Sequence, residues 1–373
     1  MLSMQPSRWR AIADKYVADI QSGRLGPGDR LPSDAALAEI CGVSRVTAHK
    51  ALAELRRLGL VTRNGRNGTS VSAQERQSTG RVALVLDQVA LQRDFPRTDL
   101  LAGIHEGLGQ FGNLLWCDSE RDPERERNFL QRMPKETDGI LCWPTGHAKS
   151  NVVLNDLTKR RVPLVLLDRV PKDVQAHAVV SDSSGATHHA MSHLIERGHR
   201  RIGLLSFDKP NVSTVQERVG GYAQVMEENG LPTNGLYRRF PASLEFGDSE
   251  FFSQAVYDAV FTLVKSSEPA TALFCIQDMF CAAAMDAVMR IGLSIPEDLE
   301  IVAFNDWPLH MLLRPWQVHR IYTRATDIGR IAAKVLLSQI GGEWTEPSVH
   351  RVPADFVLAD AGINPPSPDL SYR

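Results

Sequence analysis

From residue 81 onward, short runs of aliphatic and β-branched residues alternate with longer amphipathic stretches. The runs are RVALVLD, NLLWCD, DGILCWP, VPLVLLDR, RIGLLSF, TALFCIQ and LEIVAFND, which is typical of strands buried on both faces. Helical spacing covers the segments between them, at 99–110, 123–133, 150–160, 184–197, 217–229, 250–265 and 278–291. Because strands and helices alternate over so many units, the pattern predicts an α/β fold with a parallel sheet and helices on both faces.

Polar side chains follow these predicted strands, and ligands of such sheets bind at the carboxyl ends of the strands. The pattern alone therefore predicts a ligand site formed by Asp87, Asp168, Arg169, Gln277, Asp278, Asn305 and Asp306. Trp143, like Phe95 and Trp307, follows a predicted strand and can stack on the apolar face of a ligand, although such residues more often pack in a core. Acids and amides at these positions also cap helices and form turns, and for Asp278 and Asp306 both interpretations stay open.

Residues 1–71 have a different pattern. An amphipathic helix at 8–22 precedes two short helices, and Leu37, Ala38 and Ile40 are the predicted apolar side of the first of these. A Gly-Val turn leads to Ser44 at the N-cap position of the next helix, whose predicted buried stripe is Val46, Leu52 and Leu55. Residues 60–71 then predict two strands around an Asn-Gly turn. The order is that of a helix-turn-helix with a basic wing.

The second helix of such a motif can lie in the DNA major groove with its N-terminal residues against base edges. The side chains near that end are Ser44, Arg45, Thr47, His49 and Lys50, and Arg63 and Arg66 lie at the tip of the wing. Arginine can donate two parallel hydrogen bonds to guanine, and threonine can bond a base or a phosphate. The alternative is an ordinary helical hairpin with solvated charges.

Composition narrows the class of protein. A chain of 373 residues suggests two or three lobes, and 43% hydrophobic with 23% charged residues favours neither disorder nor a membrane protein. We expect no membrane span and no signal peptide, and five scattered cysteines predict reduced thiols in a cytoplasm. Residues 1–80 hold 12 Lys and Arg against 7 acidic residues, whereas the rest hold 30 against 37. A basic module on an acidic body suits a DNA-binding protein.

The stretch GDRLPSDAALAEICGVSRVTAHKALAELRRLGLV, followed by NGRNGTSV, closely resembles the winged-helix domain of GntR-type transcription regulators over residues 8–71. The resemblance adds Ser33, in its L-P-S element, and Gly68, in the wing, to the expected DNA-binding residues. One departure matters. The family usually carries Glu-Arg after L-P-S, and that Arg touches operator DNA, whereas this chain has Asp34-Ala35.

A second resemblance covers residues 81–361. VPLVLLDRV, VVSDSSGATHHAMSHLIERGHRRIGLLSF, ERVGGYAQVMEENG and PATALFCIQDMFCAAAMDAVMRIGLSIPEDLEIVAFND resemble the effector domain of LacI-type regulators, which is related to periplasmic sugar-binding proteins. It implies two Rossmann-like lobes joined by three crossovers, a ligand between them and a homodimer. The combination is similar in organisation to arabinose-responsive repressors. Gln277 and Asn305 depart from the family's usual Asn and Asp, so the ligand need not be the relatives' sugar.

Arg218, in ERVGGY, falls where the LacI-like family binds ligand hydroxyls with an Arg, and its five donors can clamp neighbouring oxygens. The alternative is a surface Arg at the start of a helix. Asp182 is expected to cap a helix. His189 and His193 are four residues apart, but neither a third ligand nor a zinc motif accompanies them, so we predict no metal and no cofactor. The chain has no nucleophile elbow and no phosphate-binding loop.

We therefore expect a winged helix-turn-helix at 1–71, a linker at 72–80, a type I periplasmic-binding-protein-like domain at 81–361 and a tail at 362–373. The predicted protein is a cytoplasmic, nucleoid-associated homodimer. It represses transcription from double-stranded operator DNA and responds to a small polar effector, such as a carbohydrate. Helices at 99–110 and 281–288 are the candidate dimer surfaces. The alternatives are an enzyme, such as a sugar kinase or isomerase, with an accessory helix-turn-helix, and a binding protein that only senses or transports.

Overall fold

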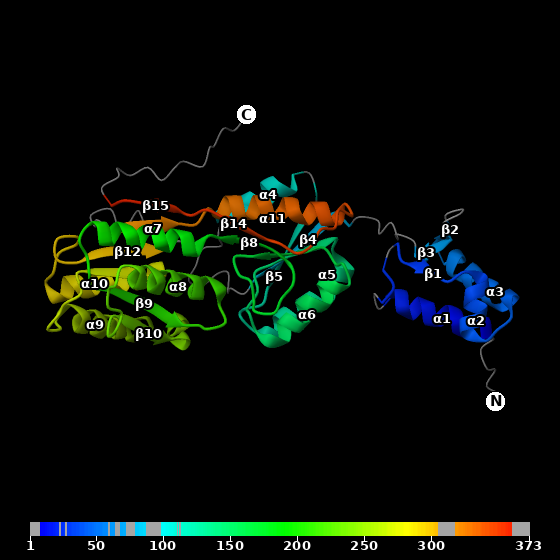
Figure 1. Ribbon diagram of the computed structural model, residues 1–373, viewed down its shortest axis with the longest axis horizontal. Coiled ribbons are helices and arrows are strands. Elements are labelled where there is room, and N and C mark those ends of the chain that lie inside the picture. The colour runs from blue at the N-terminus through cyan, green and yellow to red at the C-terminus, as the bar shows by residue number, and fades with distance from the viewer. Residues whose placement is uncertain are drawn as a thin grey trace.

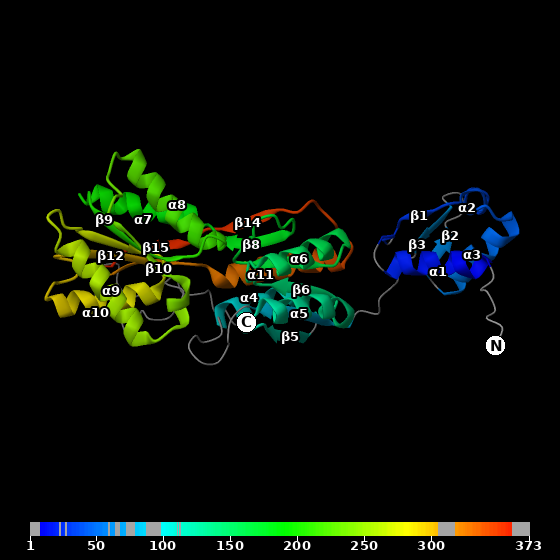
Figure 2. The ribbon, with the colours of Figure 1, turned by 90° about the horizontal axis from the view of Figure 1, so that it is seen from below.

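The computed structural model describes residues 8–21, 24–26, 28–58, 60–63, 68–71, 79–86, 98–109, 111, 113–304 and 318–359. A small N-terminal body of helices and short strands is followed by two larger lobes, each built on a six-stranded sheet (Figure 1). The small body lies apart from both lobes, next to the first of them (Figure 2). This architecture confirms the predicted fold class. None of the described helices is long and apolar enough to cross a membrane.

The N-terminal body is a winged helix. Its elements are α1 (Arg8–Gln21), β1 (Arg30–Leu31), α2 (Asp34–Cys41), α3 (Arg45–Arg57), β2 (Val61–Arg63) and β3 (Thr69–Val71), with the strands in the antiparallel order β1-β3-β2. Leu37, Leu52 and Leu55 are buried at its centre, where Ile12 and Tyr16 of α1 pack against them. Apolar residues at helical spacing thus meet in one small core, as the periodicity predicts.

Two of the predicted core residues of this body are wrong. Ile40 and Val46 are 67% and 66% exposed. The buried residues of α3 are Ala48, Ala51, Leu52 and Leu55, and a residue two positions before Ala48 points to the opposite side of a helix. Helix α2 faces the core with Leu37, Ala38 and Cys41, which leaves Ile40 on the outer side.

The first lobe has six parallel strands in the order β5-β4-β6-β7-β8-β14. Its strands are β4 (Arg81–Leu86), β5 (Asn113–Asp118), β6 (Gly139–Cys142), β7 (Leu164–Leu167), β8 (His177–Ser181) and β14 (Val349–Val352). Its helices are α4 (Thr98–Leu108), α5 (Pro123–Glu136), α6 (Ala148–Lys159) and α11 (Ala325–Ile340). Because every strand runs the same way, the carboxyl ends of β4, β6 and β7 share one edge of the sheet.

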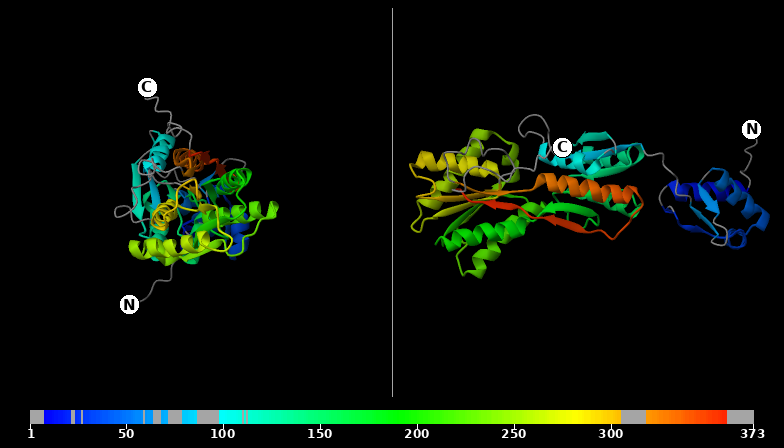
Figure 3. Two further views of the ribbon diagram at one scale, coloured as in Figure 1. Left: turned by 90° about the vertical axis from the view of Figure 1, so that its left-hand side faces the viewer. Right: turned by 90° about the horizontal axis from the view of Figure 1, so that it is seen from above.

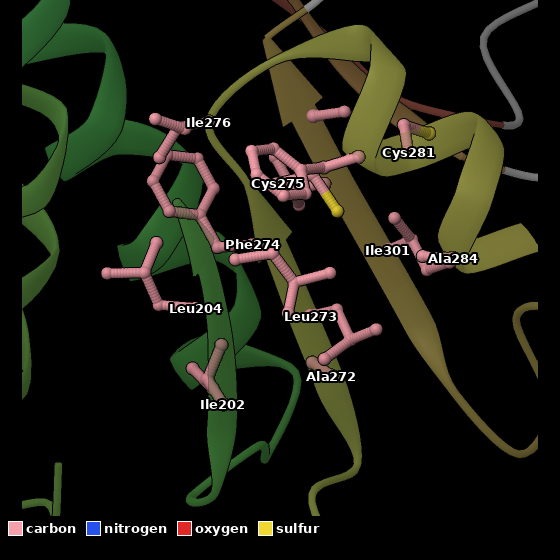
Figure 4. Packing of buried hydrophobic residues seen from close by; sticks show 14 of the residues in the cluster. Ile202, Leu204, Ala272, Leu273, Phe274, Cys275, Ile276, Cys281, Ala284 and Ile301 are labelled. Carbon is pink, nitrogen blue, oxygen red and sulfur yellow. The ribbon is translucent and has the colours of Figure 1, made fainter. Parts of the chain in front are cut away.

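The second lobe repeats this strand order as β10-β9-β11-β12-β13-β15, with only β15 antiparallel. Its strands are β9 (Ile202–Asp208), β10 (Tyr237–Pro241), β11 (Ala272–Cys275), β12 (Glu300–Phe304), β13 (His319–Tyr322) and β15 (Asp355–Val357). Its helices are α7 (Ser183–Glu196), α8 (Ser213–Glu228), η2 (Ala242–Phe246), α9 (Ser249–Val264) and α10 (Asp278–Ile291). Side chains of β9, β11, β12 and α10 fill its core, among them Leu204, Phe274 and Ala284 (Figure 4).

The chain passes between the lobes three times, as the resemblance to LacI-type regulators implies. It crosses after β8, after β13 and after β14, so α11 lies in the first lobe although it follows strands of the second. Helix α11 packs along α4 so closely that the backbones of the two helices approach each other (Figure 3). A Cβ on Gly103 would lie 1.9 Å from the carbonyl oxygen of Thr326, and one on Gly329 would lie 2.3 Å from that of Leu100. Glycine is therefore required at both positions.

Some predicted boundaries change. Helix α8 begins at Ser213, four residues before the predicted start, and α11 has no counterpart among the predicted helices. All five cysteines are free, and Cys117, Cys142, Cys275 and Cys281 are buried.

Candidate functional sites

The start of α3 is held by a side-chain cap. The Ser44 hydroxyl accepts a hydrogen bond from the Thr47 backbone N–H at 3.2 Å and lies 2.8 Å from the Thr47 hydroxyl. Ser44 is therefore the predicted N-cap, and the cap sets the direction in which the first turn of α3 presents its side chains. Ser33 caps α2 in the same way, accepting from the Ala36 N–H at 3.3 Å.

The exposed face of α3 carries the charged residues that the sequence selects for DNA. Arg45, His49 and Lys50 are all exposed, whereas Ala48 between them is wholly buried. His49 Nδ1 lies 3.2 Å from Asp34 Oδ2, which ties the recognition helix to the first residue of α2. The arrangement brings a basic surface to one side of the winged helix, where a phosphate backbone and base edges can meet it.

The wing contributes a second basic position. Arg63 is exposed at the end of β2, opposite Thr69 of β3. Gly68 has a φ of +84°, a conformation that favours glycine, directly before β3. Arg66 lies outside the described residues.

Three of the predicted ligand residues come together at the carboxyl edge of the first lobe. The Arg169 guanidinium lies 5.7 Å from the Trp143 ring centroid, and its Nη1 donates to the Pro144 carbonyl at 3.4 Å. Arg169 Nε lies 3.8 Å from Asp168 Oδ2. Asp168 has a φ of +62°, a strained conformation that Asp tolerates better than most residues. Backbone strain of this kind is typical of functional sites, so the conformation of Asp168 supports a functional role for its side chain.

A buried acid supports this edge, and sequence analysis did not select it. Glu126 of α5 is fully buried, and its carboxylate accepts from the Thr145 N–H at 2.8 Å and from the Thr145 hydroxyl at 2.6 Å. These bonds fix the loop after β6, which carries Trp143. A glutamate inside an amphipathic helix gives no signal in the sequence, because its partner lies nineteen residues away in a loop.

Arg218 is buried in the second lobe rather than at the surface. It is 4% exposed, and its Nη1 donates to the Ile276 carbonyl at 2.8 Å. Its Nε lies 3.4 Å from the Ser183 hydroxyl, and its guanidinium lies 3.8 Å from the centre of the Phe304 ring. Ser183 begins α7, and Ile276 and Phe304 lie at the carboxyl ends of β11 and β12. Arg218 therefore stands at the strand ends where parallel sheets bind ligands.

A second polar group at this edge was only partly predicted. Gln277 Nε2 donates to Glu245 Oε1 at 3.3 Å, and Lys209 forms an ion pair with the same carboxylate. Lys209 directly follows β9 in the structure but lies two residues after the predicted run RIGLLSF, and Glu245 lies in η2, so the strand-end pattern selects neither residue. Asp278 is the first residue of α10, and its Oδ1 accepts from the neighbouring Met279 N–H at 2.8 Å; Gln277 is the N-cap and makes no side-chain capping bond.

The two lobes touch beside these groups. The Val170 N–H donates to the Ser213 hydroxyl at 3.0 Å, joining the loop after β7 to the first residue of α8. Arg351 of β14 donates to Glu217 of α8 at 2.9 Å, and this partner raises the pKa of Arg351. The contacts link the first lobe to the helix that carries Arg218. Asp87, Asn305 and Asp306, with Phe95 and Trp307, lie outside the described residues.

A buried carboxylate in the second lobe also escaped the sequence analysis. Glu300 is 2% exposed and accepts from His319 Nε2 at 2.6 Å, from His199 Nε2 at 2.8 Å and from Arg197 Nε at 2.8 Å. Burial alone would raise the pKa of Glu300, but hydrogen bonds from His199, Arg197 and His319 lower it below its ordinary value. The group joins the end of α7 to β12 and β13.

His193, Glu300 and His319 have their polar atoms within 4.8 Å of one another, a set that could hold a metal ion. The hydrogen bonds argue otherwise. His319 Nδ1 accepts from the Ala359 N–H at 3.1 Å, so the ring proton is on Nε2 and is donated to Glu300. That tautomer leaves Nε2 no lone pair for an ion. His193 Nε2 is buried and has no hydrogen-bond partner among the described residues, and burial lowers the pKa of His193.

Two family profiles match the chain. Residues 9–71 match "Bacterial regulatory proteins, gntR family", and residues 191–358 match "Periplasmic binding protein-like domain". The chain thus joins a GntR-type DNA-binding domain to a domain of the periplasmic-binding-protein type, as both resemblances in the sequence imply.

Similar proteins include transcriptional repressors. The arabinose metabolism transcriptional repressor of Geobacillus stearothermophilus is 26% identical over 342 residues, which is 89% of this chain and 91% of that protein. The HTH-type transcriptional repressor PurR of Aliivibrio fischeri strain MJ11 is 26% identical over 253 residues, 67% of this chain and 72% of that protein. The solved complex of the transcriptional regulator CelR with cellobiose has a TM-score of 0.64 at 20% identity and covers 88% of this chain and 99% of that chain.

Proposed function

We propose that this chain, a GntR-type winged helix joined to a LacI-like two-lobed domain, is a transcriptional repressor controlled by a small polar effector. The repressors similar to it are not enzymes, which removes the support for an enzyme with an accessory helix-turn-helix. A repressor acts where operator DNA is, so we place it in the cytoplasm with the nucleoid.

The observation that carries the proposal is the exposed face of α3. Arg45, His49 and Lys50 stand clear of the winged-helix core on a capped helix, so they are available to DNA without disturbing the fold. Arg63 extends the basic surface to the wing. We assign base reading to Arg45, whose guanidinium suits a guanine edge, and phosphate contacts to Lys50 and Arg63.

The effector is assigned to the strand ends between the lobes. Arg218, held by Ile276 and Phe304, presents a fixed cation at the strand ends of the second lobe. Asp168 and Arg169 stand at the strand ends of the first, beside Trp143, which is 4% exposed and packed in the core. Cationic and carboxylate groups at such strand ends suit the hydroxyls of a polyhydroxylated ligand such as a sugar or sugar derivative. An arabinose repressor among the similar proteins and a cellobiose complex among the similar structures support this class.

We also propose that the protein works as a homodimer. One winged helix covers few base pairs, and two copies related by a twofold axis can read a near-palindrome. Ala283, Ala284 and Ala287 of α10 are buried in the core of their own lobe. A partner subunit would therefore contact the exposed residues of α10, such as Met289, which is 47% exposed. A sedimentation measurement that gave a monomer with full operator affinity would rule this dimer out.

The experiment has two arms. A thermal-shift screen of the full chain against sugars, sugar acids and nucleosides should identify a stabilising effector. Duplexes selected by the protein from a randomised DNA pool should then bind less tightly when that effector is present. Failure of the protein to enrich any duplex from the pool would reject the proposed function.

Arg45→Ala tests the DNA surface directly. We expect it to lose about 1–3 kcal/mol of affinity for the selected duplex, together with the preference at one base pair, because a bidentate contact to guanine disappears. Lys50→Ala is the matched control and should weaken all sequences alike. Equal losses on selected and random DNA for Arg45→Ala would remove Arg45 from base reading.

A further inference from the structure

Asp34 and His49 form a contact between the two helices of the helix-turn-helix. Asp34 is the first residue of α2, directly after the Ser33 cap, and His49 lies in the second turn of α3. His49 Nδ1 is 3.2 Å from Asp34 Oδ2, and the side chains are 54% and 27% exposed respectively.

The contact decides which nitrogen of His49 carries the proton. An ionised carboxylate only accepts hydrogen bonds, so Nδ1 must be the donor to Asp34. Nε2 lies on the opposite side of the ring and makes no hydrogen bond within the part of the chain that the structure describes. In the neutral imidazole Nε2 is therefore an acceptor.

We infer that Asp34 positions His49 and sets its tautomer, so that Nε2 accepts a hydrogen bond from an exocyclic amino group in the major groove. The bases that present such a donor there are adenine, through N6, and cytosine, through N4. His49 is then a specificity-determining residue and Asp34 its positioning residue. The inference rests on the proposed DNA-binding role of α3.

Asp34 has two other effects that must be separated from this one. An acid in the first turn stabilises α2 through the helix dipole, so its loss can weaken the winged helix for every DNA sequence alike. A carboxylate near DNA also repels phosphates, so its removal can strengthen binding to every sequence alike. Neither effect changes the ratio of affinities for two duplexes that differ at one base pair, whereas loss of the His49 tautomer does.

The experiment uses the full chain at pH 8, where imidazole side chains are largely neutral. Duplexes are selected from a randomised pool by the unmodified protein and by His49→Ala, and the base pair whose preference changes is identified. The dissociation constants of the preferred duplex are then measured with the natural base and with an analogue of its adenine or cytosine that lacks the exocyclic amino group, because every base pair contains one of these two bases. The unmodified protein should bind the natural duplex about 3- to 10-fold more tightly, the range of one net hydrogen bond.

His49→Ala should bring this ratio close to 1. Asp34→Asn should at least halve it, because an amide can either accept from Nδ1 or donate to it and no longer selects a tautomer. In the double variant, the ratio of the two dissociation constants should be the same as in His49→Ala alone. Lys50→Ala is the control that weakens both duplexes and keeps the ratio.

Each of the other possible results rejects one component of the inference. An unchanged ratio for Asp34→Asn, with or without an equal loss on both duplexes, leaves Asp34 only an acid that stabilises the first turn of α2. A ratio near 1 for the unmodified protein, at a base pair whose preference depends on His49, means that Nε2 does not accept from that amino group and refutes the assigned tautomer. If the unmodified protein enriches no duplex at all, the proposed DNA-binding function fails, a result distinct from the two above.

Discussion

The two lobes share one strand order but are held together differently. In the first, α4 and α11 approach at Gly103 and Gly329, and most side chains of its two cores are aliphatic. In the second, phenylalanines form the centre, with the ring centroids of Phe207 and Phe280 4.5 Å apart, and the buried Glu300 joins three elements. The shared strand order gives both lobes the same arrangement of strand ends. It does not determine which side chains form the core of each lobe.

The difference teaches where each lobe is vulnerable. Backbone contact between α4 and α11 cannot adjust to added volume, because protein interiors are close-packed and a carbonyl group is not a flexible side chain. Buried charges instead depend on keeping every partner, since a charge left without one is strongly destabilising. Added volume at the contact between α4 and α11 should therefore harm the first lobe, and loss of a partner of Glu300 or Arg218 should harm the second.

The largest effect is expected from Gly103→Ala in the first lobe. Its Cβ would lie 1.9 Å from the Thr326 carbonyl oxygen, so the two helices must separate. We expect a loss of at least about 2–3 kcal/mol in unfolding free energy, seen as a thermal midpoint lowered by roughly 5–10 °C. Gly220→Ala is the control, because Gly220 is an exposed helical glycine of α8 with nothing within 4 Å of an added Cβ. It should be neutral or slightly stabilising.

An intermediate effect is expected from Arg218→Met in the second lobe. The change removes the donor to the Ile276 carbonyl and should lower stability by about 1–3 kcal/mol, measured by denaturant titration. It should also abolish the response to the effector while leaving operator binding without effector near its original strength. Arg239→Met, at an exposed position of the same lobe, should stay within about 0.5 kcal/mol of the unmodified protein. Full effector affinity in Arg218→Met would move the ligand site elsewhere.

The smallest effect is a pH dependence that arises in the second lobe, at His193 and Glu300. Burial, then the neighbouring His319, lower the pKa of His193 below its ordinary value of 6.5, although Glu300 opposes them. The unfolded chain then binds a proton more readily than the folded one, so stability present above pH 6.5 is lost as pH falls below it. Glu300, whose pKa is also lowered, extends the loss to pH values below its ordinary value of 4.5.

Thermal midpoints measured from pH 8 down to about pH 3 check this prediction. His193→Gln should flatten the decline that begins near pH 6.5, whereas His188→Gln, a change at an exposed histidine of the same helix, should leave it. An identical decline in His193→Gln would assign the pH dependence to other groups.

Much of the fold follows from local patterns. The start of α3 is the clearest case, because Ser44 caps the helix three residues before the N–H that it accepts, and such a pair is visible in the sequence. The alternation of buried runs and helices likewise predicts a parallel sheet covered by helices, and the resemblance to LacI-type regulators divides it into two lobes. The alternation does not place α11, because the lobe to which a helix returns depends on which surface it covers and not on its own periodicity.

The candidate sites divide in the same way. Arg45 and Arg218 stand in motifs that a reader of the sequence can find. The partners that position the side chains are distant along the chain, as with Glu126 and Thr145, or with Asp34 and His49. Ile40 and Val46 show the converse, since their apolar character alone does not say which side of a short helix meets the core.

The sequence by itself determined the two kinds of domain, the capped recognition helix and the strand ends that carry polar residues, because each depends on residues a few positions apart. The tertiary structure alone decided how these parts are held. Buried Gln339 of α11 accepts from the Leu164 N–H at 2.9 Å, across 175 positions of the chain. Gly103 of α4 meets Thr326 across a similar span. Periodicity is local, whereas complementary packing and hydrogen bonding between distant segments exist only once the chain has folded.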